Sequence, residues 1–203
     1  MAYIKVLNYD NKTNNKKKKR SILTYIERNK FVRANNGIRL LPSVELRNAK
    51  FIRCSNDAAI GENSKLLCVA KYNGVEFEPK IEIGKNFHAT RKLVIQCAYK
   101  VIIGDNVLVA SNVFIIDYNH GLSPETESYL DNSLELSDGV FIEDGVWIGN
   151  SAIILPGVRI GKKSIIGAGS VVSSDIPSYS LAVGVPAKVI KRYDFKSKSW
   201  KKV

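Results

Sequence analysis

Residues 140–172 read VFIEDGVWIGNSAIILPGVRIGKKSIIGAGSVV, and one aliphatic residue recurs in this stretch at every sixth position. These positions are Ile142, Ile148, Ile154, Ile160, Ile166 and Val172. The same rule holds upstream at Cys97, Ile103, Val109 and Ile115, and in fragments at Ile60/Leu66 and Ile83/Ala89. An Ile-Gly pair results at 60/61, 83/84, 103/104, 148/149, 160/161 and 166/167. The chain therefore carries a six-residue repeat in its C-terminal half, with an earlier block and fragments upstream.

A period of six fits neither an amphipathic helix, with its period of 3.6, nor a half-buried strand, with its period of two. It predicts a mainly β fold, a triangular parallel β-solenoid in which each hexad forms one short strand and one corner. Three hexads make a coil, and stacked aliphatic side chains fill the interior. We expect the glycine beside each inward aliphatic residue, together with Asn and Asp, to give the corners their backbone freedom.

The two blocks of repeats are out of phase, because 27 residues separate Ile115 from Ile142. Residues 117–138 (DYNHGLSPETESYLDNSLELSD) lack the pattern and are rich in turn formers and acids, which predicts a long excursion loop. We divide the chain into a basic N-terminal extension (1–44), a solenoid domain (45–192) and a C-terminal tail (193–203). The extension is expected to hold a short helix over Ile22–Val32, and the tail to fray after a short helix or strand.

Composition indicates a single folded domain, since 203 residues with 45% hydrophobic and 25% charged side chains are close to globular averages. The apolar stretches Val107–Ile116 and Ser151–Val158 are too short to span a bilayer, and the N-terminus lacks the features of a signal peptide, so we expect a soluble, cytoplasmic protein. The three cysteines, Cys54, Cys68 and Cys97, are expected to be reduced and partly buried. Two histidines exclude a site of three imidazoles, and we predict no metal.

The net charge of +12 is concentrated at the two ends of the chain. Residues 1–40 carry 11 Lys/Arg and 2 acids, residues 186–203 carry 7 and 1, and the body carries 13 and 16. Because the body is slightly acidic, no basic face for nucleic acid is predicted. The run Lys16–Arg20 has two interpretations, a solubilising leader or a peripheral contact with an anionic membrane surface.

The repeat, and above all the stretch from Val140 to Lys191, resembles the hexapeptide-repeat (left-handed β-helix) acyltransferases, in particular bacterial polysaccharide and sugar O-acetyltransferases. The resemblance is strong over about residues 97–192, weak over 45–96 and absent over 1–40. It implies a left-handed coil and acetyl-CoA as cosubstrate. It also implies a homotrimer with active sites between subunits, which the flat faces of a prism, the outward Trp147 and the long loop favour independently.

His120 lies in the sequence DYNHG (117–121) at the start of the excursion loop. Related transferases carry an Asn-His element there, so the resemblance implies that His120 is the general base, with Asn119 beside it. Imidazole suits this task because its pKa is near neutral. A base needs a partner that orients its second nitrogen; Asp117, Asn112 and Glu143 are available, and we choose Asp117. No activated Ser or Cys nucleophile is evident, which predicts direct transfer. His88 has no motif around it and is interpreted as structural or exposed.

Alternation along the strand predicts that Trp147 points outward, next to the inward Ile148. The resemblance implies that this coil lines the acetyl-CoA groove. The other predicted contacts are Asn150, Ala168, Ser173 and Ser174 for the pantetheine arm and Lys188 and Lys191 for the nucleotide phosphates. Relatives often have Arg at the last two positions, so point-charge contacts replace bidentate ones here.

These features together predict an acetyl-CoA-dependent O-acetyltransferase acting on a sugar hydroxyl in surface-polysaccharide synthesis. Three alternatives stay open, two of them enzymes. The nearest enzyme is an N-acetyltransferase of an amino-sugar nucleotide, and the next is an enzyme that acetylates a small molecule such as serine or an antibiotic. The third is from a different class, a non-catalytic solenoid that binds anionic partners through its basic ends.

Overall fold

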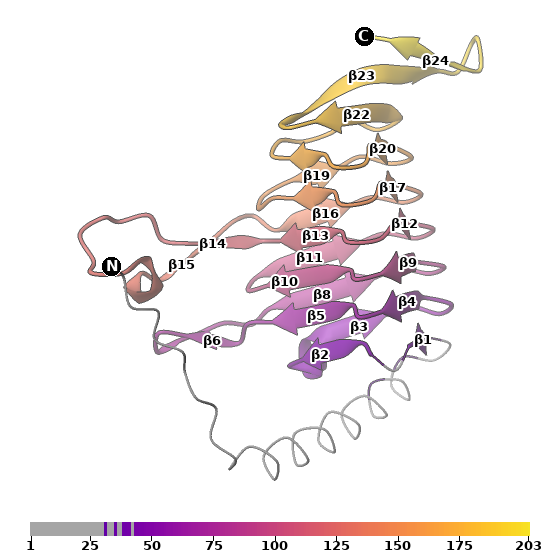
Figure 1. Ribbon diagram of the computed structural model, residues 1–203. Helices are drawn as coiled ribbons and strands as arrows, with labels where there is room; N and C mark the ends of the chain where they lie inside the picture. Colours follow the sequence, from indigo (N-terminus) through magenta and orange to yellow (C-terminus); the bar gives the residue numbers. More distant parts are fainter. Residues whose placement is uncertain (1–30, 32–34, 36–37, 42) are drawn as a thin grey trace, which may run out of the picture.

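The computed structural model describes residues 31, 35, 38–41 and 43–203, which form a three-sided prism of stacked coils (Figure 1). Apart from Phe31, the helix expected over Ile22–Val32 lies outside the described residues, as does the run Lys16–Arg20. The fold is a left-handed parallel β-helix built from hexapeptide repeats, as the sequence predicted. None of the helices in the described ranges is long and apolar enough to cross a bilayer.

Three sheets, here called A, B and C, form the sides of the prism, and their strands are parallel except for β23 and β24 at the end of sheet A. Sheet A contains β1 (Arg39–Leu40), β4 (Ala59–Glu62), β9 (His88–Arg91), β12 (Leu108–Val109), β17 (Trp147–Ile148), β20 (Ile165–Ile166), β22 (Ser180–Gly184), β23 (Ala187–Asp194) and β24 (Ser199–Lys202). Sheet B contains β2 (Glu45–Arg47), β5 (Lys65–Cys68), β10 (Val94–Cys97), β13 (Phe114–Ile116), β18 (Ile153–Ile154) and β21 (Val171–Val172). Sheet C contains β3 (Ile52–Cys54), β8 (Lys80–Ile83), β11 (Lys100–Ile103), β16 (Val140–Ile142) and β19 (Arg159–Ile160).

The strand register stacks the inward aliphatic residues of successive coils on one another. In sheet A, Val109 pairs with Ile148, which pairs with Ile166, and in sheet B Ile154 lies between Ile115 and Val172. The residue two positions before each of these is also buried, for example Val146 before Ile148. Where that residue is a serine it is hydrogen-bonded: the Ser164 hydroxyl donates to the Pro177 carbonyl at 2.7 Å. Each hexad therefore fills the core with two side chains, and this accounts for the one-in-six pattern of large aliphatics.

The glycine that follows the inward aliphatic residue serves close approach of the coils rather than backbone freedom, which corrects the expectation. A Cβ on Gly149 would lie 2.6 Å from the backbone nitrogen of Ala168 in the next coil, and none of the Ile-Gly glycines has a positive φ. The left-handed residue comes two positions later, at Asn63, Asn86, Asn106, Ser151, Lys163 and Gly169. In each such corner the glycine leaves room for the neighbouring coil, and the residue two positions later adopts the left-handed conformation.

The C-terminal tail is ordered, so the expected fraying is wrong. Strand β23 pairs antiparallel with β22, and β24 pairs antiparallel with β23, which places a hairpin over the last coil (Figure 1). Its aromatic side chains form edge-to-face contacts, with Tyr193 beside Phe195 and Trp200 and with Phe195 beside Tyr179. Lys201 and Lys202 lie on the outer strand, where charge discourages further strand pairing.

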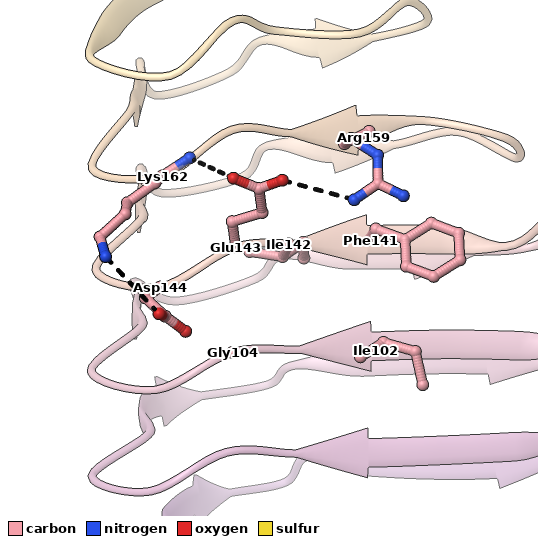
Figure 2. A pocket seen from close by; sticks show the side chains of 8 residues that line it. All are labelled: Ile102, Gly104, Phe141, Ile142, Glu143, Asp144, Arg159 and Lys162. Atoms are coloured by element: carbon pink, nitrogen blue, oxygen red, sulfur yellow. Dashed lines mark hydrogen bonds and ion pairs between the residues drawn. The ribbon is translucent and has the colours of Figure 1, made fainter.

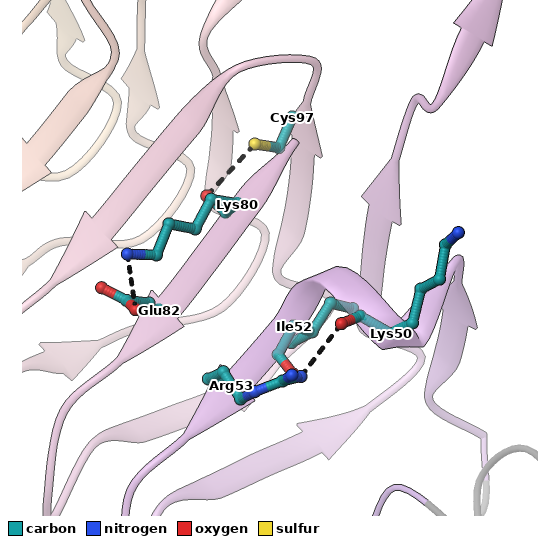
Figure 3. A network of polar contacts seen from close by, with 6 residues as sticks. All are labelled: Lys50, Ile52, Arg53, Lys80, Glu82 and Cys97. Carbon is teal, nitrogen blue, oxygen red and sulfur yellow. Dashed lines mark hydrogen bonds and ion pairs between the residues drawn. The ribbon is translucent and has the colours of Figure 1, made fainter. Parts of the chain in front are cut away.

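All three cysteines are free and buried, as expected. Burial raises the pKa of the Cys54 thiol to about 12. Cys68 and Cys97 are direct neighbours in sheet B, and hydrogen bonding with Cys68, burial and the nearby Asp117 carboxylate all raise the pKa of Cys97. The Cys97 sulfur lies 3.4 Å from the Lys80 carbonyl, on the edge between sheets B and C (Figure 3).

Candidate active site

His120 ends β14 (Tyr118–His120), a strand that leaves the prism directly after β13. The excursion passes through a 3-10 turn, η2 (Tyr129–Asp131), and returns along β15 (Leu134–Leu136) before sheet C resumes at β16. Strands β14 and β15 pair antiparallel, with His120 opposite Leu134 (Figure 1). The segment expected as a loop therefore leaves the prism as two paired strands joined by the turn η2. It springs from the edge between sheets B and C.

A second, shorter excursion leaves the prism at the same edge. It was not predicted from the sequence. Strands β6 (Lys71–Tyr72) and β7 (Val75–Glu76) form an antiparallel hairpin between β5 and β8. Its turn is Asn73-Gly74, with φ of 45° and 82°. Asn-Gly between two short β-prone segments is the strongest local hairpin signal, so this element was readable in the sequence. Its insertion also explains why the repeat is weak over residues 45–96.

The two excursions pack together outside the prism. They share a small apolar cluster centred on three buried residues, Ala98, Tyr118 and Leu134. Four further side chains cover this cluster: Val69, Tyr72, Phe77 and Ile116. Ala98 lies in the B-to-C corner of the coil between the two excursions. The B-to-C corners of three successive coils therefore all contribute to this apolar cluster. The short hairpin thereby supports the long loop from below (Figure 1).

Polar contacts between the excursions converge on His120. The Tyr72 hydroxyl donates to the Leu130 carbonyl at 2.6 Å and lies 3.2 Å from Nδ1 of His120. The two rings meet edge to face, 5.3 Å apart and at 69°. Asn73 donates to the same Leu130 carbonyl at 2.7 Å. The imidazole of His120 is thus half-buried and held by a partner that sequence analysis did not name.

The expectation that Asp117 orients His120 is corrected by the geometry. Asp117 is fully buried and its carboxylate accepts hydrogen bonds from the backbone nitrogens of Ala98 at 2.8 Å and Tyr99 at 3.0 Å. The backbone nitrogen of Lys100 donates to it as well. These contacts point the carboxylate back into the prism, where it caps the corner between β10 and β11. Its proximity also contributes, after burial, to a raised pKa of Tyr118.

The two other candidates for an orienting partner are also engaged elsewhere. Glu143 accepts from the guanidinium of Arg159 at 3.4 Å and from the backbone nitrogen of Lys162 at 2.9 Å, on the outer face of sheet C. Figure 2 shows these residues around a shallow groove of about 230 Å³, where Arg159 lies over the Phe141 ring. Asn112 donates to the side chain of Asn150 at 3.3 Å. Asn119 is exposed, and strand alternation sends it to the opposite face from His120.

The residues expected at the cofactor lie on two edges of the prism. Asn150 and Ala168 occupy neighbouring A-to-B corners, which are joined by a hydrogen bond of 2.7 Å from the Gly169 nitrogen to the Asn150 carbonyl. Ser173 and Ser174 follow β21, so they lie on the B-to-C edge and are exposed. A site made from both edges would span different sides of one subunit.

Trp147 points outward, as alternation predicted, and 49% of its surface is exposed. It lies in sheet A between Leu108 and Ile165. Lys188 and Lys191 lie on β23, opposite Val183 and Leu181 of β22. The cofactor contacts of these residues stay predictions.

Comparison with known proteins places the chain in a family. Residues 139–174 match the family model described as bacterial transferase hexapeptide (six repeats). The chain is 38% identical over 143 residues to the galactoside O-acetyltransferase of Escherichia coli K12, covering 70% of this chain and 68% of that protein. It is 35% identical over 181 residues to the putative lipopolysaccharide biosynthesis O-acetyl transferase WbbJ of the same organism, covering 80% and 89%.

A solved structure supports the same assignment. A galactoside acetyltransferase in complex with coenzyme A superimposes with a TM-score of 0.62 at 26% identity, covering 97% of this chain and 92% of that one. The chain therefore belongs to the hexapeptide-repeat acetyltransferases. It is an acyltransferase, and more narrowly an acetyltransferase that uses acetyl-CoA.

Proposed function

We propose that this acetyltransferase moves the acetyl group of acetyl-CoA to a hydroxyl of a sugar in surface-polysaccharide synthesis, with His120 as the general base. The observation that carries the proposal is the placement of His120. Its imidazole is half-buried, is held by Tyr72 and lies close to the point where the excursion leaves the prism. A general base needs such a position, which is fixed by the protein but reachable by an acceptor from solution. The names of the two Escherichia coli relatives support a sugar acceptor.

The reaction is a direct transfer. The imidazole of His120 removes the proton of the acceptor hydroxyl while the oxygen attacks the thioester carbonyl of acetyl-CoA. A carbon–oxygen bond forms, the carbon–sulfur bond breaks, and the coenzyme A thiolate takes the proton back from the imidazolium. A base in this role contributes about 10²–10⁴-fold. Asn119 precedes the base on the exposed side of β14, where it is open to an acceptor or a neighbouring subunit.

Acetyl-CoA is proposed to lie beside the sheet A coil that carries Trp147. Asn150 and Ala168 offer backbone and amide contacts for the pantetheine arm at adjacent corners. Ser173 and Ser174 add hydroxyls on the second edge. Lys188 and Lys191 supply positive charge for the phosphates, as point charges rather than forked donors.

A homotrimer is supported by the outer surfaces of the prism. Sheet A presents the apolar ladder Leu108, Trp147, Ile165 and Leu181, and sheet B presents Val94, Phe114, Ile153 and Val171. The outer face of sheet C carries the ion pair of Lys80 with Glu82, and Arg159 at its edge pairs with Glu143. Two different apolar faces that meet at one corner favour a cyclic, head-to-tail assembly, in which face A of one subunit meets face B of the next. Sedimentation at micromolar concentration should give three times the mass of the chain.

A screen of acceptors tests the substrate class. Acetyl-CoA is offered with neutral sugars, amino sugars, nucleotide-linked sugars and serine, and release of the coenzyme A thiol is followed. Thiol release with sugars that carry no free amine is expected. Release that requires an amine would point to N-acetylation, and binding without turnover of any acceptor would point to a non-catalytic solenoid.

The run Lys16–Arg20 is proposed to hold the enzyme near acceptors that carry phosphate, at an anionic membrane surface. Each Lys or Arg close to such a surface contributes about 1 kcal/mol, and the contribution is screened by salt. Neutralising the run should weaken sedimentation with anionic vesicles at low salt and leave transfer to a small uncharged sugar unchanged. Equal vesicle binding by both proteins at every salt concentration would leave the run a solubilising leader.

A further inference from the structure

We propose that Tyr72 is a positioning residue that fixes the tautomer of His120, so that Nδ1 carries the proton and Nε2 is left as the base. The inference rests on the proposed role of His120, and it assigns to the short hairpin β6–β7 a part in the chemistry that the hexad repeat does not contain. It follows from counting the protons available at three neighbouring groups.

The Tyr72 hydroxyl has one proton and two neighbours. The Leu130 carbonyl can only accept a hydrogen bond, and its oxygen is 2.6 Å from the hydroxyl, so the proton lies on that line. The hydroxyl oxygen is then an acceptor toward Nδ1 of His120, 3.2 Å away. Nδ1 must be the nitrogen that carries hydrogen, because a neutral imidazole has one protonated and one unprotonated nitrogen. The lone pair is left on Nε2.

The Leu130 carbonyl is held in place independently of Tyr72. It lies in the 3-10 turn η2, whose N-cap is Ser128, and the Ser128 hydroxyl accepts from the Leu130 nitrogen at 3.2 Å. Asn73, on the same hairpin as Tyr72, donates to this carbonyl at 2.7 Å and to that of Asn132 at 3.3 Å. The acceptor that takes the tyrosine proton is therefore fixed by the turn and by the hairpin together.

The position of the Tyr72 ring is fixed by packing. The ring packs against the cluster of Ala98, Tyr118 and Leu134, as does Phe77 of the same excursion. In the described part of the subunit, no hydrogen bond occupies Nε2 of His120, whereas Nδ1 has Tyr72. The nitrogen left with the lone pair is thus also the one open to an acceptor hydroxyl.

The tautomer of His120 can be measured by NMR, because the chain contains two histidines and the other one, His88, is exposed on β9. Imidazole ¹⁵N spectra are recorded for the full-length enzyme at a pH where His120 is neutral, with His120→Gln for assignment. The expected signals are a protonated Nδ1 and an unprotonated Nε2. In Tyr72→Phe a population with the proton on Nε2 should appear, and kcat should fall about 10–100-fold, the range found when groups that orient a metal-bound histidine are removed. The KM for acetyl-CoA should stay unchanged.

Tyr118→Phe is the matched control, since its hydroxyl belongs to the same cluster but bonds to Gln96 at 3.0 Å. It should keep the parent tautomer and kcat. The proposal is overturned if the parent enzyme holds its proton on Nε2, if Tyr72→Phe keeps the parent spectrum, or if both tyrosine variants lower kcat equally. The first of these outcomes needs no variant, so poor folding of Tyr72→Phe does not protect the proposal. Full activity of His120→Gln would instead overturn the proposed base while leaving the tautomer result standing.

Discussion

The carboxylate of Asp117 accepts a hydrogen bond of 2.8 Å from the backbone nitrogen of Ala98, one coil earlier in the prism. This contact and its neighbours at Tyr99 and Lys100 make Asp117 the cap of the corner beneath the excursion loop. A residue three positions before the proposed base therefore acts on the backbone of the previous coil. It defines the point at which the chain leaves the solenoid.

Replacing Asp117 with Asn should lower stability more than catalysis. The amide would keep one acceptor oxygen and turn a donor toward backbone N–H groups, and leaving a buried donor unpaired costs about 1–3 kcal/mol. Urea denaturation gives the stability change, and kcat is measured where both proteins are folded. A loss of kcat as large as that of His120→Ala, in a fully folded Asp117→Asn enzyme, would restore the orienting role that the subunit geometry removes.

His120→Ala should lower kcat by about 10²–10⁴-fold, because the acceptor hydroxyl loses its base. Affinity for coenzyme A should be unchanged, as measured by calorimetry. The matched control is His88→Ala, which removes the exposed histidine of β9 and should leave kcat within a few-fold of the parent. Activity of His120→Ala close to that of the His88 variant would refute the assignment.

Trp147 should report cofactor binding by its fluorescence. The chain has two tryptophans, and Trp200→Phe leaves Trp147 as the sole emitter. Because Trp147 is 49% exposed on sheet A, coenzyme A bound over it should change its emission in a saturable way. In the converse variant, Trp147→Phe, the remaining Trp200 in the C-terminal hairpin should not respond. A response confined to Trp200 would move the cofactor groove away from the coil of Trp147 and toward the C-terminal hairpin.

Mixing two inactive enzymes tests whether the active site lies between subunits. His120→Ala lacks the base, and Trp147→Ala is expected to lack the cofactor contact. If each site takes these residues from neighbouring subunits of a trimer, denaturing and refolding the two variants together should restore part of the activity. Mixed trimers that remain inactive would place both residues of a site in one subunit.

Gly149→Ala should destabilise the protein more than Gly169→Ala, although both glycines lie at corners of the same edge. A Cβ at Gly149 would be 2.6 Å from the Ala168 nitrogen, so the two coils would have to separate. Gly169 has φ of 70° with open space around it, so alanine there costs only the left-handed conformation, about 1 kcal/mol. Urea midpoints of the two variants give the comparison. Equal losses would mean that the coils tolerate the extra methyl group.

Stability should fall as the pH rises from about 9 toward about 12, because burial raises the pKa of Cys54 from 9.0 to about 12. Between these values the unfolded thiol ionises and the folded one does not, so the unfolded state gains stability. The contribution is fully present below pH 9 and is lost toward pH 12. Urea denaturation across this range measures the loss, and Cys54→Ala should reduce it. Thiol-specific reagents should modify the native cysteines far more slowly than the unfolded ones.

Local sequence determined the solenoid and the place of its main excursion. The hexad repeat was visible in the sequence because every coil repeats the same local alternation. Ile148 and Ile166 could therefore each be placed in the core from their own hexads, without knowing that they pair with each other. The break in phase between Ile115 and Ile142 located the loop for the same reason. The C-terminal hairpin was not foreseen, because β23 and β24 depend on pairing with β22 and on contacts such as Tyr193 with Trp200 rather than on the repeat.

The surroundings of His120 were decided by tertiary structure alone. Residues 72 and 120 are 48 positions apart, and they meet because two excursions spring from the same edge of the prism with one coil between them. Which edge an excursion leaves depends on the number of hexads before it and on the handedness of the coil, and neither is visible in the residues beside the histidine. Asp117 was chosen because it lies three positions before His120 in the sequence. In the structure its carboxylate instead accepts hydrogen bonds from the backbone N–H groups of the preceding corner. Tyr72 carries no motif, and only the folded chain places its hydroxyl against the imidazole.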